Sequence, residues 1–437
     1  MPPIIVGLIG VVALLVIIAL RAPLGLALLG VGFTSLWYLH GWDTALYVAS
    51  TAPVTVMSSH TLSVLPLFIF MGAISVRSGL AESLYNAAYG FVGHRRGGLA
   101  IASIAACAGF GAICGSSLAT VSTMGRIAVP QMKRYGYDRK LAAGSVATGG
   151  TLGILIPPSL PMIIYAMVTE TSIGKLFAAG LIPGIIATLL YIAVTAVWTY
   201  LKPDIGPAGK RLPWSERFKL LFQVWGVVGL FIVVMGGILT GIFSPTEGAA
   251  VGAMGATVLG LARFIRDRTY LERFFGAVKE AIQTSVMIFF AVIGISVFEY
   301  FLQAARVPQG VESFISSLNF GPFGVMALLL VVLILLGCFL DSIAILFIIT
   351  PVIFPIVVAN GFDPIWFGII MIMVVEFGLV TPPIGMNVFL LSKLLPDTTT
   401  WEVFLGVLPY LAADFLRLAI FLAFPAIVLW LPSLLFP

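Results

Sequence analysis

Residues 149–159 read GGTLGILIPPS, and residues 374–384 read VVEFGLVTPPI. In both stretches a glycine, Gly153 or Gly378, stands four residues before a pair of prolines. A proline inside a helix removes a backbone donor and leaves the carbonyl four residues earlier without its partner. Each stretch therefore predicts a helix that breaks near its middle and leaves main-chain oxygens free at the break.

The shift along the chain that carries Gly153 onto Gly378 also aligns other landmarks. It pairs Pro130 with Pro355, Gly136 with Gly361, Asp138 with Asp363, and Ser116 with Asp341. One register that holds from residue 116 to residue 158 indicates an internal repeat. We predict a first repeat over residues 1–201, a linker over residues 202–220 and a second repeat over residues 221–437.

The composition predicts an all-α polytopic membrane protein. Of 437 residues, 60% are apolar and only 9% are charged, and the mean hydropathy is +1.13. A soluble domain carries about 25% charged residues. The first apolar run has no basic leader or small-residue cleavage site, so we expect a retained helix. The net charge of +5 comes from Lys and Arg in short loops, as in membrane proteins, and does not indicate nucleic-acid binding.

Ten apolar runs are near the roughly 20 residues that a spanning helix needs. They cover residues 3–20, 23–39, 54–76, 142–169, 176–200, 222–241, 247–264, 281–303, 364–392 and 402–434. Two further stretches, residues 99–132 and 322–360, contain too many Gly, Ser or Pro residues for an ordinary span. Broken backbone at membrane depth is tolerated only where it is buried in protein or lines a cavity.

Basic loops orient the chain, because Lys and Arg favour the cytoplasmic side. The richest clusters cover residues 94–96, 133–140, 202–219 and 263–273. The first two flank residues 99–132 on both sides, so this stretch is predicted to be a re-entrant hairpin that opens to the cytoplasm. Residues 322–360 are predicted to be a second hairpin of opposite orientation. Each repeat then has three spans, a hairpin and two spans, and the repeats are inverted, as in secondary transporters.

Two amphipathic stretches, residues 81–91 and 271–282, carry mixed charge. Two interpretations stay open for them. They are either arms in the membrane interface that brace a mobile unit, or ordinary juxtamembrane helices.

Glycine and hydroxyl residues gather at the predicted breaks. Free backbone oxygens in a dry pocket suit a hard alkali cation. The first half offers the hydroxyls of Ser116, Ser117, Thr120 and Thr148. The second half offers Gly337, Asp341, Gly378, Thr381, Pro382, Pro383 and Asn387. Close helix packing would explain one isolated motif of this kind, but the duplication favours a pair of alkali-cation sites.

Helices that start after each hairpin tip present free N–H groups and a positive dipole end, which favour a carboxylate. The candidate substrate contacts are Thr120, Arg126, Thr148 and Asn387, with Thr381 as a further side-chain contact. Arg126 either attracts an anionic substrate or extends to the cytoplasmic surface.

Other ionisable residues at membrane depth are costly and count as candidates for function. Asp341 either neutralises a cation or accepts backbone N–H bonds at the hairpin tip. Glu376 stands two residues before Gly378. We expect Glu299, Asp414 and Arg417 to lie at helix contacts or interfaces. Cys107, Cys114 and Cys338 lie in apolar segments without metal spacing, so we expect core packing and no transition metal.

At these residues the sequence resembles the large membrane subunit of tripartite ATP-independent periplasmic (TRAP) transporters. The matching stretches are GSSLATVSTMG at 115–125, GGTLGILIPPS at 149–159, SPTEGAAVGA at 244–253, FLDSIAILFIITPVIFPI at 339–356 and EFGLVTPPIGMNVF at 376–389. The resemblance covers nearly the whole chain. It implies an elevator mechanism in the bacterial inner membrane, a separate small four-helix membrane subunit, and a periplasmic solute-binding protein that delivers the solute.

The resemblance also implies two sodium sites, made mostly of backbone oxygens. The ligands it implies at the first are Ser116, Gly153, Ile156 and Pro158, to which the hydroxyl of Ser117 can be added. Those it implies at the second are Gly337, Gly378, Thr381 and Ile384, to which the carboxylate of Asp341 can be added.

The predicted function is sodium-coupled uptake of a small organic anion such as a dicarboxylate or a sugar acid. A single-component sodium–dicarboxylate carrier of similar architecture is the main alternative, and an ion channel is another. An intramembrane serine protease around residues 115–118 would need a histidine base, but His40, His60 and His94 lie outside both hairpins. We therefore expect no enzyme activity. The chain has no phosphate-binding G-x-x-x-x-G-K-[ST] loop, so we expect no use of ATP.

Overall fold

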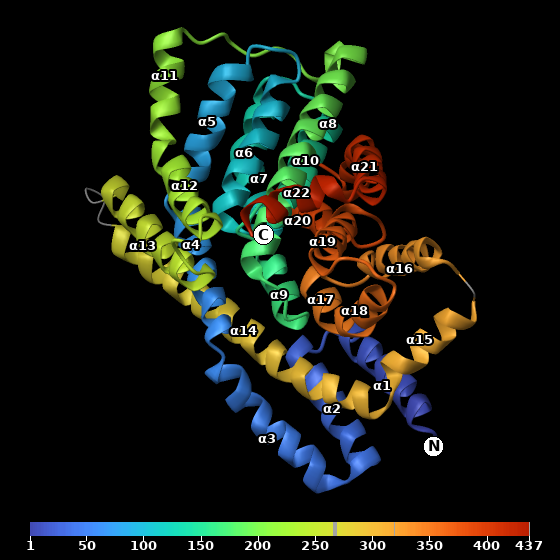
Figure 1. Ribbon diagram of the computed structural model, residues 1–437. Coiled ribbons are helices and arrows are strands. Elements are labelled where there is room, and N and C mark those ends of the chain that lie inside the picture. Colours follow the sequence, from blue (N-terminus) through green and yellow to red (C-terminus); the bar gives the residue numbers. More distant parts are fainter. Residues whose placement is uncertain (265–268, 319, 437) are drawn as a thin grey trace.

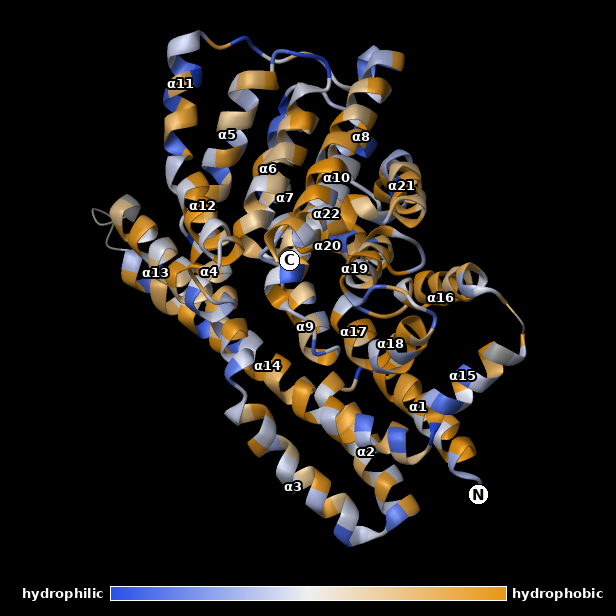
Figure 2. Ribbon diagram, in the orientation of Figure 1, coloured by the Kyte–Doolittle hydropathy of each residue, from blue (hydrophilic) through white to orange (hydrophobic). Residues whose placement is uncertain are grey.

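The computed structural model describes residues 1–264, 269–318 and 320–436, and in this part of the chain every regular element is a helix (Figure 1). Residues 265–268, inside the predicted basic loop 263–273, lie outside the described residues. Four of the described helices are long and apolar enough to cross a membrane, and three bent helix pairs raise this number to at most seven. Apolar residues dominate most helices, and hydrophilic residues gather in the loop between α10 and α11 (Figure 2). This confirms the prediction of an all-α, multi-pass membrane protein.

One set of helices packs around the longest helix, α14, and we call it the α14 group. Its members are α1 (Pro3–Ala19), α2 (Leu24–His40), α3 (Trp42–Ser58), α4 (Val64–Arg77), α12 (Trp225–Leu239), α13 (Pro245–Phe264) and α14 (Tyr270–Ala304). Helix α14 lies against α2, α3 and α4, and α13 lies against α4 and α12. In Figure 1 this group occupies the left and lower parts of the molecule.

The helices of the two hairpins and those packed against them form a second set, which we call the hairpin group. From the first half it contains α6 (Gly98–Cys114), α7 (Ser117–Arg134), α8 (Arg139–Leu155), α9 (Leu160–Val168) and α10 (Ile173–Leu201). From the second half it contains α16 (Pro322–Gly337), α17 (Ser342–Ile348), α18 (Thr350–Ala359), α19 (Pro364–Val380), α20 (Met386–Leu394), α21 (Thr400–Ala423) and α22 (Ala426–Leu435). Helix α8 packs against α6, α7 and α21, and α20 packs against α7, so the two halves interlock in this group.

Two short helices connect the groups: α5 (Leu80–Val92), which packs on α6, and α15 (Val307–Ser317), which packs on α14 and α18. The helix bounds follow the predicted repeat closely. The shift that carries Gly153 onto Gly378 also carries both ends of α8 onto those of α19, and the start of α7 onto that of α17. The same capping carboxylate starts both broken helices, because Asp138 accepts the amides of Lys140 and Leu141 and Asp363 accepts those of Ile365 and Trp366. The repeat boundaries and their inversion across the membrane stay predictions.

The helix boundaries in two of the predicted segments differ from the prediction. The span predicted over residues 54–76 is interrupted, because α3 ends at Ser58 and a 3-10 turn (His60–Ser63) precedes α4. The polar residues of α3 lower its mean hydropathy, so a search for apolar runs does not find it as a span. Its hydroxyls are satisfied within the helix, as when Thr51 donates to the Tyr47 carbonyl over 2.9 Å. Residues 271–282 are not a separate helix, because they continue into α14 without a break, whereas residues 81–91 form the separate helix α5.

The linker between the halves is attached to the hairpin group. The Gly97 amide donates to the Gly206 carbonyl and the Gly209 amide to the Gly93 carbonyl, both over 2.8 Å. The Asp138 amide donates to the Ile205 carbonyl over 2.9 Å. Helix α11 (Trp214–Gln223) then leads into α12 with a bend of 44°.

The two halves also meet at the loop that precedes α21. Lys133, in the last turn of α7, forms an ion pair with Asp397, and Arg139 donates to the Asp397 carbonyl. The hydrogen bond from Lys133 holds the pKa of the exposed Asp397 carboxyl below its usual value. This loop therefore lies at the same end of the molecule as the base of the first hairpin.

Candidate sodium and substrate sites

The first predicted hairpin is a pair of packed helices, α6 and α7, with its tip at Gly115 and Ser116. Gly115 has φ +64°, a conformation that favours glycine, and it ends α6. Ser116 caps α7, because its side chain accepts the Ala119 amide over 3.4 Å. Its main-chain carbonyl accepts the Thr120 hydroxyl over 2.8 Å. The tip is thus ordered by local hydrogen bonds and faces the break in the next helix.

That break lies between α8 and α9, which are bent by 42°. A Cβ placed on Gly153 would lie 3.1 Å from the Ser116 carbonyl oxygen and 2.9 Å from the Thr120 hydroxyl. A Cβ placed on Gly115 would lie 2.8 Å from the Pro158 carbonyl oxygen. The structure therefore places three of the predicted ligands, Ser116, Gly153 and Pro158, where the hairpin tip packs on the break. The main-chain oxygen of Ser116 faces Gly153, and that of Pro158 faces Gly115.

The side chains of two other residues predicted for this site have contacts elsewhere, and the place of both residues as ligands stays a prediction. Ile156 lies in the break, but its side chain packs against Gly184 of α10. The Ser117 hydroxyl contacts Asn387 of α20, whose side-chain amide donates to it over 2.8 Å. The same amide donates to the Ala147 carbonyl over 3.1 Å. Ser117 and Asn387, one predicted for sodium and one for substrate, are therefore partners of each other.

The second predicted site has the same construction. A Cβ placed on Gly378 would lie only 2.1 Å from the Gly337 carbonyl oxygen, so α16 and α19 approach to backbone contact there. The Thr381 hydroxyl donates to the Phe377 carbonyl over 2.8 Å and lies 3.3 Å from the Cys338 sulfur. Gly337, Gly378 and Thr381 thus lie together, at the end of one hairpin helix and at the break after α19.

Asp341 and Ile384 lie at the edge of this second group of residues. The Asp341 carboxylate accepts the Ala344 amide over 3.0 Å, which is the tip-capping role considered from the sequence. The capping bond uses one oxygen only, and Asp341 also borders the cavity described next. Ile384 is 40% exposed.

A cavity of about 100 Å³ separates the two hairpin tips. It is lined by Gly115, Ser116, Ser117, Leu118, Ile154, Leu160, Pro161, Asp341, Ser342, Ile343, Leu379 and Met386. Four of these are the first residues of helices, namely Ser117 of α7, Leu160 of α9, Ser342 of α17 and Met386 of α20. Free amides and positive dipole ends of several helices therefore meet at one small space.

A second cavity, of about 350 Å³, shares Asp341 and Ile343 with the first. Its other walls come from the α14 group, including Leu24 of α2 and Ala291 of α14. The space between the hairpin tips thus lies at the boundary between the two groups of helices.

Four residues predicted to contact substrate do not line the small cavity, although Thr120 and Asn387 bond to Ser116 and Ser117, which do. The described residues that line it include none of Thr120, Arg126, Thr148 and Asn387. Arg126 is exposed on α7, about 14 Å along the helix from Ser117. Thr148 is buried, and its hydroxyl has no hydrogen-bond partner among the described residues.

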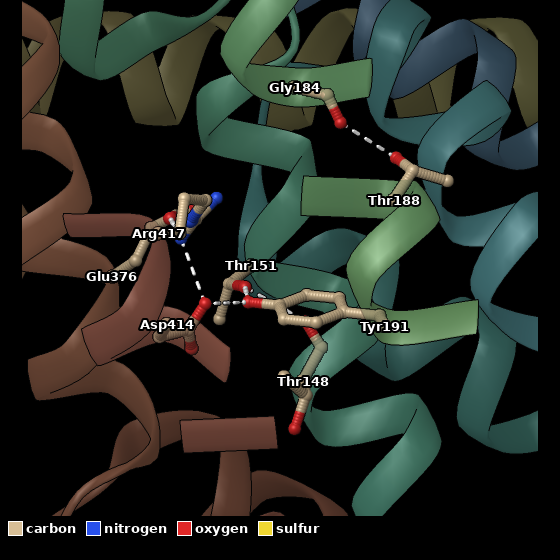
Figure 3. Close-up of polar contacts among 8 residues, drawn as sticks. All are labelled: Thr148, Thr151, Gly184, Thr188, Tyr191, Glu376, Asp414 and Arg417. Carbon is tan, nitrogen blue, oxygen red and sulfur yellow. Dashed lines mark hydrogen bonds and ion pairs between the residues drawn. The ribbon is translucent and has the colours of Figure 1, made fainter. Parts of the chain in front are cut away.

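The ionisable residues Glu376, Asp414 and Arg417 form one buried cluster (Figure 3). Arg417 donates to Glu376 over 2.8 Å and to Asp414 over 2.9 Å, and all three side chains are at most 2% exposed. Asp414 and Arg417 therefore do lie at a helix contact, between α19 and α21. The sequence did not indicate their further partner, Tyr191 of α10, because a tyrosine in an apolar span gives no signal of its own. Glu299 lies apart from this cluster and borders a cavity of about 330 Å³ between α9 and α14.

Comparison with known proteins agrees with this architecture. The family model described as "Tripartite ATP-independent periplasmic transporter, DctM component" matches residues 11–427. The chain is 38% identical over 377 residues to the C4-dicarboxylate TRAP transporter large permease protein DctM of Pseudomonas aeruginosa, and the match covers 86% of each protein. It is 31% identical over 416 residues to the sialic acid TRAP transporter large permease protein SiaM of Vibrio cholerae, covering 94% of this chain and 95% of that one.

A solved structure, the YdaH transporter of Alcanivorax borkumensis, has a similar fold, with a TM-score of 0.63 at 15% identity. The similarity covers 98% of this chain and 100% of that one. Together with the paired hairpins and broken helices, the match over residues 11–427 places the chain: it belongs to the DctM family of tripartite ATP-independent periplasmic transporters.

Proposed function

We propose that this protein is the large permease subunit of a TRAP transporter that uses a sodium gradient to import a small organic anion across the bacterial inner membrane. The observation that carries the proposal is the cavity between the hairpin tips. The helices α7, α9 and α20 all begin at it, so the positive dipole ends of three helices lie beside a space that is otherwise lined mainly by apolar side chains and by the Asp341 carboxylate. A carboxylate is the group that such a space stabilises.

Sodium coupling is supported by the oxygens beside this cavity. Ser116 and Pro158 supply carbonyls in the first half, and Gly337 supplies one in the second, each packed against a glycine of the opposing segment. Carbonyl and hydroxyl oxygens in a closed site suit a hard monovalent cation. Among the described residues, no Lys or Arg lines the small cavity. Two sodium ions beside the anion would therefore offset its charge.

Electrical work sets the number of ions. Moving one charge through 100 mV is worth about 2.3 kcal/mol. A dianion entering a negative-inside cell opposes twice that, and two sodium ions only balance its charge. We therefore propose that more than two sodium ions accompany each dianion, so that uptake carries net positive charge inward.

The arrangement of helices supports an elevator mechanism. The hairpin group contains both candidate sodium sites, and the second cavity lies between it and α2 and α14. In this mechanism the hairpin group moves past the α14 group and carries the sites with it. A small membrane subunit and a periplasmic solute-binding protein complete the system, and the binding protein selects the solute. Dicarboxylates and sugar acids are the proposed solute class.

Uptake into proteoliposomes tests the function. The large and small subunits are reconstituted together, the binding protein is added outside, and radiolabelled succinate and sialic acid are offered. We expect accumulation only with an inward sodium gradient and with the binding protein present, and faster accumulation with a negative interior. Accumulation that is unchanged when choline or potassium replaces sodium would contradict the coupling. Accumulation without the binding protein would favour a single-component carrier.

A further inference from the structure

A continuous line of buried polar contacts joins the two broken helices (Figure 3). At one end, Arg417 of α21 donates to Glu376 of α19 over 2.8 Å and to Asp414 over 2.9 Å. The Tyr191 hydroxyl of α10 donates to the same Asp414 oxygen over 2.6 Å. At the other end, this hydroxyl lies 3.4 Å from the hydroxyl of Thr151 in α8. The line therefore runs from α19 through α21 and α10 to α8.

The two ends of the line occupy equivalent positions in the repeat. The shift that carries Gly153 onto Gly378 also carries Thr151 onto Glu376, because each stands two residues before its glycine. Both glycines belong to candidate sodium sites and are in backbone contact with a hairpin, at the Ser116 carbonyl and at Gly337 respectively. A shift of either broken helix at its sodium site therefore also moves one end of the line.

The energetics make the line sensitive to such shifts. Glu376, Asp414 and Arg417 are fully enclosed, with exposures of 1%, 1% and 0%. A buried charge that loses its partner costs several kcal/mol, so the three side chains must move together. The contacts are also incomplete, because Glu376 Oε1 and Arg417 Nε and Nη1 have no hydrogen-bond partner among the described residues. Partly satisfied buried networks respond strongly to small changes of geometry.

We propose that this line couples the two sodium sites, so that sodium at one site raises the affinity of the other. The inference rests on the proposed sodium coupling and adds a role for Tyr191, Asp414 and Arg417 as positioning residues. None of the three belongs to either candidate site. Linkage requires the effect to be reciprocal, and the coupling factor that we expect is about 5, at the lower end of typical allosteric couplings.

Tyr191→Phe removes the hydroxyl that bonds to Asp414 and contacts Thr151, and it keeps the ring and nearly the same side-chain volume. Tyr410→Phe is the matched control, because Tyr410 is equally buried, packs against Tyr191 with ring centroids 5.8 Å apart and, among the described residues, bonds only to Thr195, over 2.8 Å. The purified complex of the large and small subunits is titrated with sodium alone, with its thermal stability as the measure of binding. We expect a Hill coefficient well above about 1 for the unmodified protein and for the control. For Tyr191→Phe we expect a value near 1 and a half-saturating sodium concentration about 2-fold higher, because loss of a coupling factor of about 5 shifts the midpoint of two equivalent sites by the square root of that factor.

The outcomes separate the two proposals. If the unmodified protein does not respond to sodium, the proposed function is contradicted. If it responds cooperatively and Tyr191→Phe does the same, the proposed function stands and the coupling is contradicted. Thr151→Val, which removes the other side of the 3.4 Å contact, is a second variant with the same expected result.

A local readout makes the test independent of overall stability. Cys338 is partly exposed beside Thr381, whereas Cys107 and Cys114 are buried. We expect sodium to protect Cys338 from a small maleimide. Gly153→Ala, which crowds the first site, should raise the protecting sodium concentration about 2-fold in the otherwise unmodified protein and leave it unchanged when Tyr191→Phe is also present. Equal shifts in both backgrounds would overturn the coupling.

Discussion

The side-chain amide of Asn387, in the first turn of α20, donates to the hydroxyl of Ser117, the first residue of α7, over 2.8 Å. The two residues are far apart in the sequence and both are buried. Because Asn387 also donates to the Ala147 carbonyl of α8, one amide holds three helices from both halves at the start of the first hairpin's second helix.

Asn387→Ala should destabilise the protein, because it leaves the Ser117 hydroxyl and the Ala147 carbonyl buried without this partner. A loss of about 1–3 kcal/mol in unfolding free energy is expected, measured as a lower midpoint of thermal unfolding in detergent. Asn360→Ala is the control, since in the part of the chain that the structure describes the Asn360 side chain donates only to the Ile356 carbonyl of the helix that it ends, α18. Equal effects of the two substitutions would show that the contact between the halves contributes nothing special.

Gly378→Ala should disable the second candidate sodium site. The added Cβ would lie 2.1 Å from the Gly337 carbonyl oxygen, so α16 and α19 must separate. Overpacking of this kind costs about 1–3 kcal/mol, and we expect sodium affinity to fall about 10-fold, since each 1.4 kcal/mol is a factor of about 10. Sodium-dependent uptake is the measurement. Gly236→Ala in α12 serves for comparison, because a Cβ there meets no atom within 4 Å, and it should leave uptake unchanged.

Arg417→Met should prevent stable folding, because two carboxylates would stay buried without their cation. Removing one member of a buried ion pair costs about 3–5 kcal/mol. The triple variant that adds Glu376→Gln and Asp414→Asn removes the charges as well, and it should recover most of the folded yield, measured by size-exclusion chromatography in detergent. A triple variant no more stable than Arg417→Met would show that packing, rather than charge, accounts for the loss.

Single cysteines at Arg95 and Lys133 should react with an impermeant maleimide from the same side of the membrane, since they flank the first hairpin. Cysteines at Glu312 and Asp363 should react from the opposite side, since they flank the second. Inside-out and right-side-out vesicles, prepared from a variant without Cys338, provide the two accessible faces. Labelling of Arg95→Cys and Lys133→Cys from different sides would make residues 99–132 an ordinary span and remove the basis for inverted repeats.

The features that the sequence predicted well are those that depend on local backbone chemistry. The paired prolines fix the breaks after α8 and α19, and Asp138 and Asp363 mark the starts of those helices at matching positions of the repeat. The hairpin tip follows from Gly115, whose positive φ ends α6 immediately before the cap of α7. Such features need only a few neighbouring residues, so their pattern is visible in one chain.

Features that depend on tertiary contacts were not visible. Helix α3 was missed because its polar residues lower its hydropathy, although Thr51 and its neighbours bond within the helix. Ser117 stays a predicted sodium ligand, but its hydrogen bond with Asn387 was not foreseen, because no local rule relates the two residues. The partnership of Tyr191 with Asp414 is of the same kind, because the two residues belong to different halves of the chain.

The attachment of the linker has a mechanical consequence. Three backbone hydrogen bonds fix residues 205–209 to the ends of the hairpin group, so this part of the connection cannot lengthen or swing on its own. If the two groups of helices slide past each other, the linker has to change direction beyond residue 209. The bend of 44° where α11 meets α12, at Val224, is a place where it can do so. Together with the connections through α5 and α15, this joint then limits how far the groups can move, and a rigid joint at Val224 would slow the proposed import while leaving the candidate sodium sites in place.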